Sequence, residues 1–197
     1  SIEDKVVHFL VTMKEGITFI RGTSEILYPF LFLVWLQIAM SILVVNLPAI
    51  ATEIVLTRPA LSGPLVVLPA GIGAVLGTIL IEKLAGRKFR KKTIVHSGLV
   101  GMSAAFLGVS ILLPLLPFWI GRMVLLVSFL LLGVSFVATL VPTLTFMQEK
   151  TPREYAGRVF GNFWFVTTAL TVLPVIFSAT ITEILGVRLM LITLGVA

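Results

Sequence analysis

Long stretches that are almost free of charge alternate with short charged segments along this chain. A transmembrane helix needs about 20 consecutive apolar residues, and the long stretches reach that length. They cover residues 27–51, 63–82, 93–114, 121–148 and 159–182. A further apolar run at 189–197 is too short to cross. The pattern predicts an all-α integral membrane protein with five complete transmembrane helices and a truncated sixth, and we expect a fragment of a longer protein.

Residues 1–25 follow a different pattern. Apolar side chains recur every three or four positions from Val6 to Ile20, which is the period of one helical face, and charged residues flank that face. Such a helix is too charged to span a bilayer and suits the membrane interface. The segment from Glu3 to Gly22 is therefore predicted to be an interfacial linker helix ahead of the first span.

Composition agrees with a membrane protein. Hydrophobic residues make up 58% of the chain and charged residues 12%, whereas a soluble domain carries about a quarter charged residues. The net charge of +6 would suggest a nucleic-acid partner in a soluble protein, but the basic residues stand at span ends, so we expect no nucleic acid. The chain has no cysteine, which excludes disulfides and thiol chemistry.

The basic residues also predict an orientation. The segment Glu82–Lys92, the N-terminal segment and the loop at 148–158 together hold 12 of the 15 Lys and Arg, and they fall on the same side. Arg58, Arg122 and Arg188 fall on the other side. Because cytoplasmic loops carry the excess of Lys and Arg, we expect a multi-pass protein of the cell inner membrane with those three segments in the cytoplasm.

Signatures of catalysis are missing from the sequence. Neither of the two His residues has another ligand at metal-binding spacing, and no nucleophile or phosphate-binding motif occurs. His96 lies at a span end beside basic residues, where a solvated side chain is a simpler interpretation than a proton relay. We therefore expect no enzyme, no metal and no cofactor.

Polar side chains recur on one face of the first, fourth and fifth spans. Hydroxyl groups in a bilayer can bond to carbonyls of their own helix, so helix packing is one interpretation. A wet central cavity is the other. Each of these faces also carries a proline. The residues are Gln37, Ser41 and Pro48 on the first span, Ser128, Ser135, Thr139 and Pro142 or Thr143 on the fourth, and Asn162, Thr167, Thr171, Pro174 and Ser178 on the fifth.

Small residues indicate where helices approach closely. Gly73 and Gly77 are one turn apart in the second span, and Gly101 and Gly108 form a similar ridge on the third. This spacing lets two helix backbones come together. All four are therefore predicted packing positions.

Capping residues predict two helix starts. Thr23 or Ser24 is expected to cap the first span. At the second site, Thr151 is followed by Pro152 and by Glu154 three residues after it. This is the order of a capping hydroxyl, a proline at the first helical position and an acid, so Thr151 is the predicted cap.

Some passages are similar to a known family: KEGITFIRG at 14–22, PAGIGAVLGTILIEKLAGRKFRKK at 69–92 and TPREYAGRVFG at 151–161. In their order and spacing, the chain resembles the C-terminal six-helix half of a major facilitator superfamily transporter, in the branch of macrolide-efflux and enterobactin-exporter-like proteins. Gly86 stands where the family's loop motif carries Asp, and Ala156 stands where Arg is usual. The first departure argues against a charge relay through this loop.

The resemblance implies half of a 12-helix bundle that works by alternating access with an N-terminal half, in a lipid bilayer. The implied function is proton-driven efflux of a drug-like or siderophore-like small molecule. Uptake or lysolipid transport by the same fold, and a non-transporting membrane interaction subunit, stay open as alternatives. The implied cytoplasmic loop-motif residues are Arg87, Lys91, Lys92, Pro152, Gly157 and Arg158. The implied cavity residues are Gln37, Ser41, Ser128, Ser135, Thr139, Phe163, Trp164, Thr167 and Thr171.

Overall fold

Helices account for nearly all of the chain in the computed structural model, which describes residues 2–50, 52, 63–86 and 90–196, and no strand occurs among them. The long apolar stretches form helices because a backbone in a bilayer must satisfy its polar groups within its own segment. The α-helices are α1 (Ile2–Gly22), α2 (Ser24–Val45), α3 (Leu47–Ala49), α4 (Leu68–Gly86), α5 (Lys91–Leu107), α6 (Phe118–Lys150), α7 (Arg153–Leu185) and α8 (Val187–Val196). The π-helical segment η3 (Gly63–Val67) precedes α4, and the π-helical η4 (Gly108–Leu112) and 3-10 helix η5 (Leu113–Leu115) follow α5.

Within the described residues, four helical stretches are long and apolar enough to cross a membrane. They are Ser24–Val45, Leu65–Leu84, Lys91–Leu112 and Trp119–Lys150. These stretches overlap the first four predicted spans. The predicted fifth span at 159–182 lies within α7, and the short run at 189–197 overlaps α8.

The first span is shorter than predicted. The sequence predicts one helix over 27–51, but α2 ends at Val45 and Asn46 interrupts the helix before α3. Pro48 is the physical reason, because its ring lacks an N–H and clashes with the carbonyl four residues earlier. The Asn46 side chain stabilises the helix end, since its Nδ2 donates to the Ile42 carbonyl at 2.8 Å.

The described residues of the basic segment at 82–92 are mostly helical, although the sequence predicts a loop. α4 continues to Gly86 and α5 begins at Lys91, while residues 87–89 lie outside the described part of the chain. The charge of Glu82 ends the apolar run that fits inside a bilayer. The residues that follow include Lys, Leu and Ala, which are good helix formers, so the helix continues beyond the end of the apolar run. In the same way α6, with 33 residues, is about 50 Å long and exceeds a hydrocarbon core of about 30 Å.

α4 and α6 pack with their backbones in close contact. A Cβ on Gly73 would overlap the Leu130 carbonyl of α6, and a Cβ on Gly133 of α6 would overlap the Ala70 carbonyl of α4. Gly77 lies one turn further along the same contact. Glycine on both helices is what allows this approach.

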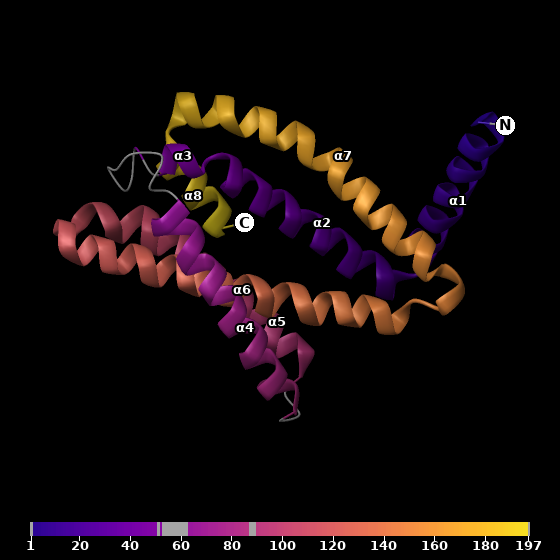
Figure 1. Cartoon of the computed structure of the whole chain (residues 1–197), viewed down its shortest axis with the longest axis horizontal. Coiled ribbons are helices and arrows are strands. Elements are labelled where there is room, and N and C mark those ends of the chain that lie inside the picture. Colours follow the sequence, from indigo (N-terminus) through magenta and orange to yellow (C-terminus); the bar gives the residue numbers. More distant parts are fainter. Residues whose placement is uncertain (1, 51, 53–62, 87–89, 197) are drawn as a thin grey trace.

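α6 is the centre of the helix packing. It contacts α4, α5 and α2, and α7 runs alongside α2 (Figure 1). α5 contacts α8, and α1 contacts both α7 and α2. Apolar side chains from these helices form the core, and other large apolar side chains are exposed, as expected for a surface that lipid covers. The largest fully buried apolar side chains are Ile26, Leu33, Leu36, Ile50, Leu125, Met147 and Leu191.

Candidate functional site

The hydroxyl row of α6 is buried. Ser128, Ser135 and Thr139 are 8%, 3% and 0% exposed. Two hydroxyls of the row bond within their own helix: Thr139 Oγ1 donates to the Ser135 carbonyl at 2.9 Å, and Thr143 Oγ1 donates to the Thr139 carbonyl at 2.7 Å. Such bonds satisfy a hydroxyl without water or a second helix.

α5 and the following segment η4 present glycines to this hydroxyl row. At two of them a Cβ would overlap a hydroxyl oxygen of α6, and at the third the Cβ position lies 3.3 Å from one. The contacts are Gly98 with Thr139, Gly101 with Ser135, and Gly108 with Ser128. The hydroxyls therefore fill the space that side chains on α5 and η4 would occupy, and the row faces these two segments.

The aromatic candidates on α7 differ in exposure. Trp164 is 64% exposed, whereas Phe163 is 4% exposed. Phe163 packs edge-to-face against Phe30 of α2, with 5.9 Å between ring centroids, and against Trp164 at 5.5 Å. On α2, Gln37 and Ser41 are partly buried. A buried ring thus supports Trp164, which presents its own ring at the surface.

Thr167 and Thr171 of α7 lie one helical turn apart. Thr167 is 3% exposed, and its Oγ1 has no hydrogen-bond partner among the described residues. Thr171 is partly buried, and its hydroxyl donates to the Thr167 carbonyl at 2.6 Å. The side chains of Pro174 and Ser178 lie outside the described part of the structure.

Charged side chains gather at one end of the bundle, termed here the basic end, where α2 and α7 begin and α6 ends. Ion pairs link helices at this end, and their side chains are 39% to 60% exposed. Exposed pairs contribute less than about 1 kcal/mol each. The pairs are Lys91 with Glu149, Lys150 with Glu25 at 2.8 Å, and Arg158 with Glu15 at 3.1 Å. Together they join α5 to α6, α6 to α2, and α7 to α1.

The other loop-motif residues have fewer contacts. Lys92 is exposed at the start of α5, and Pro152 is exposed just before α7. Gly157 has nothing within 4 Å of the position that a Cβ would take. Arg87 lies outside the described residues.

The prediction that Thr151 caps α7 is wrong. α7 begins at Arg153, Pro152 precedes it, and no side chain caps its start. The Thr151 hydroxyl donates instead to the Met147 carbonyl at 2.7 Å. The backbone N–H of Thr151 bonds to the same carbonyl, so the residue closes the end of α6. Thr23 also precedes its helix, α2, without a side-chain capping bond.

A polar contact between α1 and α7 was not predicted from the sequence. Asn162 of α7 is 1% exposed. Its Nδ2 donates to the carbonyl of Met13 at 3.1 Å and to that of Arg158 at 2.9 Å. Gly16 of α1 lies against it, and a Cβ there would overlap Nδ2. A lone glycine in an amphipathic helix and an Asn in an apolar one signal close contacts, but neither identifies its partner.

These features define the class of protein. Four helices of the described residues can cross a membrane, hydroxyl groups lie buried between helices, and charges gather at one end of the bundle. In the part of the chain that the structure describes, no group of three His, Cys, Asp or Glu side chains could hold a metal ion. The chain is an all-α, multi-pass membrane protein.

The family model of the Major Facilitator Superfamily matches residues 4–174, which is well over half of the chain. The chain belongs to this superfamily. It is therefore a membrane transporter of the major facilitator type, in contact with a lipid bilayer and with a small-molecule substrate. Comparisons with curated proteins and with solved structures find no match.

Proposed function

We propose that this chain is the C-terminal half of a secondary active exporter of the bacterial inner membrane. The proton gradient drives export of a drug-like or siderophore-like small molecule, and the two halves of the transporter alternate access to a site between them. The basic end faces the cytoplasm in this proposal. The excess of Lys and Arg on the segments that meet there supports that orientation.

The uncovered face of α7 is the observation that carries the proposal. Gly157 and Gly161 are four residues apart, and at both the Cβ position has nothing within 4 Å. The exposed Trp164 follows three residues later, on the same side of the helix. Small residues at this spacing let another helix backbone approach closely, and no helix of the described residues occupies the site. A helix of the N-terminal half would cover it.

We place the substrate beside this face, on the side formed by α2 and α7. Gln37 and Ser41 are partly exposed there, Trp164 is exposed, and Thr171 is partly buried. Phe163 supports Trp164 from behind. These side chains offer hydrogen-bonding groups and one aromatic surface in apolar surroundings, which suits an amphipathic organic molecule.

The hydroxyls of α6 have a different role in the proposal. Ser135 and Thr139 pack against glycines of α5, and Ser128 lies against Gly108 of η4. Substrate could reach them only if α5 and α6 separated. We therefore assign this row to helix packing, and Thr167 to the buried layer behind the substrate side.

Everted inner-membrane vesicles that contain the full-length transporter test this function. Ethidium serves as the drug-like probe and a ferric catecholate as the siderophore-like probe. We expect one of them to accumulate when respiration energises the vesicles, and a protonophore to abolish the accumulation. Accumulation that needs ATP hydrolysis and survives the protonophore would contradict the proposal.

Two comparisons sharpen the vesicle experiment. Gln37→Trp should reduce accumulation, while Val127→Trp should not, because Val127 on α6 is 64% exposed and tolerates bulk. Accumulation in right-side-out vesicles alone would identify an uptake system instead. If neither probe moves in either orientation, exchange of a fluorescent lysolipid tests the third transport alternative before a non-transporting subunit is accepted.

A further inference from the structure

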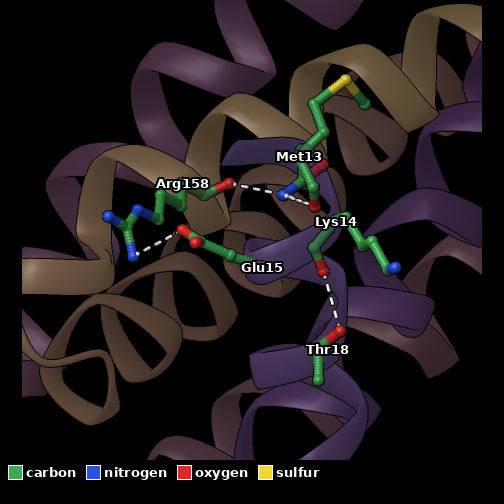
Figure 2. A network of polar contacts seen from close by, with 6 residues as sticks. Met13, Lys14, Glu15, Thr18 and Arg158 are labelled. Atoms are coloured by element: carbon green, nitrogen blue, oxygen red, sulfur yellow. Dashed lines mark hydrogen bonds and ion pairs between the residues drawn. The ribbon is translucent and has the colours of Figure 1, made fainter. Parts of the chain in front are cut away.

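α1 is held at the basic end of α7 by a compact set of contacts. The rings of Phe19 and Tyr155 stack, with 4.2 Å between centroids and 8° between planes. Glu15 pairs with Arg158 at 3.1 Å, as Figure 2 shows. Ile20, in the last turn of α1, is 3% exposed and belongs to the main hydrophobic core. The helix is therefore docked in a defined position.

Gly16 and Asn162 fix the register of this docking. Gly16 faces Asn162, and any side chain at position 16 would overlap its Nδ2. That nitrogen donates to the Met13 carbonyl of α1 and to the Arg158 carbonyl of α7, so it bridges the two helices. A shift of α1 along α7 would lose the bridge and bring a side chain against the amide.

The docked contact is specific but incompletely satisfied. Asn162 Oδ1 is buried and has no hydrogen-bond partner among the described residues. A buried acceptor without a hydrogen bond raises the free energy of the docked state, in which it is buried. The Glu15–Arg158 pair is 49% and 39% exposed, so solvent screens it. α1 also lies at the edge of the bundle (Figure 1). These properties suit a contact that opens.

We propose that α1 is a releasable latch on α7. When it is docked, it joins the start of α7 to the start of α2, which it also contacts. When it is released, Asn162 is freed to bond through both amide atoms, and the start of α7 can move. What the release accomplishes rests on the proposed function, since alternating access requires helix ends to separate on one side of the membrane at a time.

Single cysteines test the latch directly, because the chain has none of its own. In the full-length protein in native membranes, Ile20→Cys places a thiol on the buried face of α1, and a membrane-permeant maleimide labels it only when α1 lifts away. Met147→Cys is the matched control, since Met147 lies on α6 near the basic end of the bundle and is 0% exposed. We expect the thiol of Ile20→Cys to be labelled at least about tenfold faster than that of Met147→Cys, as a local opening predicts.

Two glycine variants show whether the register contact holds the latch. Gly16→Leu, added to Ile20→Cys, should accelerate labelling at least about fivefold by disfavouring the docked state. Gly22→Leu makes the same change on the same helix, but nothing lies within 4 Å of its Cβ position, so the rate should not change. If Gly16→Leu fails to fold, Asn162→Ala replaces it. Its control is Leu170→Ala, at an exposed position of α7 on the side opposite Gly161.

Equal protection of the two introduced thiols would overturn the latch, because α1 would then be a fixed part of the bundle. Equal rates for Gly16→Leu and Gly22→Leu would also overturn it, since Gly16 would not determine docking. Labelling needs no substrate and no ion gradient. A failed transport experiment would therefore contradict the proposed function and leave this result standing, and the reverse also holds.

Discussion

Gly73→Ala tests the contact between α4 and α6 with a single methyl group. The new Cβ would overlap the Leu130 carbonyl oxygen and would lie 2.9 Å from its carbon and 3.1 Å from its Cα. All three atoms belong to backbone, so no flexible side chain can move away. The two helices must separate locally to admit the methyl group.

The magnitude follows from two opposing effects. Overpacking of a close contact lowers the stability by about 1–3 kcal/mol. Replacing Gly by Ala inside a helix raises the stability by about 1 kcal/mol, through the higher helix propensity of Ala. Gly71→Ala receives only the second effect, because Gly71 is exposed and nothing lies within 4 Å of its Cβ position. The difference in stability between the two variants is therefore the overpacking cost itself, about 1–3 kcal/mol.

Thermal unfolding of the full-length protein in detergent measures this difference. About 1 kcal/mol corresponds to a shift of about 2–4 °C for a protein of about 150–250 residues, and to a smaller shift for a longer one. We expect the midpoint of Gly73→Ala to fall below that of Gly71→Ala by several degrees. Because unfolding of membrane proteins is often irreversible, all variants are heated at the same rate. Equal midpoints, or a higher one for Gly73→Ala, would refute a close backbone contact.

Ser135→Trp should lower the yield of folded protein, because Gly101 leaves no room for it; a normal yield by size-exclusion chromatography would show that the α6 row faces open space. Gln37→Trp should keep its yield and reduce probe accumulation in vesicles, and unchanged accumulation would remove Gln37 from the substrate side. A double-mutant cycle on Glu25 and Lys150 should give a coupling below about 1 kcal/mol that weakens in high salt. Coupling well above that in thermal unfolding would mean a less solvated pair than the exposure indicates.

The helices could be predicted from the sequence because an uncharged, apolar run of about 20 residues is typical of a helix that crosses a bilayer. Their ends could not be predicted as well. The apolar run through 27–51 conceals the interruption at Asn46, since Pro48 breaks a helix without adding charge. Conversely, the charges at 82–92 end the apolar run but not the helix, so α4 reaches Gly86.

Helical spacing grouped the α6 hydroxyls on one face, but it could not say what that face meets. The answer depends on Gly98 and Gly101 of α5, whose alignment with Ser135 and Thr139 is set by the crossing of two helices. Likewise, Asn162 stood out only as a polar residue in an apolar span. Its contact with Gly16 joins positions that are far apart in the chain, which no local pattern encodes.

The docking of α1 also bears on how the transporter divides into units that fold together. A boundary drawn where α2 begins would fall between Gly22 and Ser24. Two co-expressed polypeptides divided there would place Gly16 on one piece and Asn162 on the other, so the pieces would have to reassociate to restore the contact. A division ahead of α1 keeps both residues on one polypeptide. By its packing on α7 and α2, α1 belongs to the same folding unit as these helices.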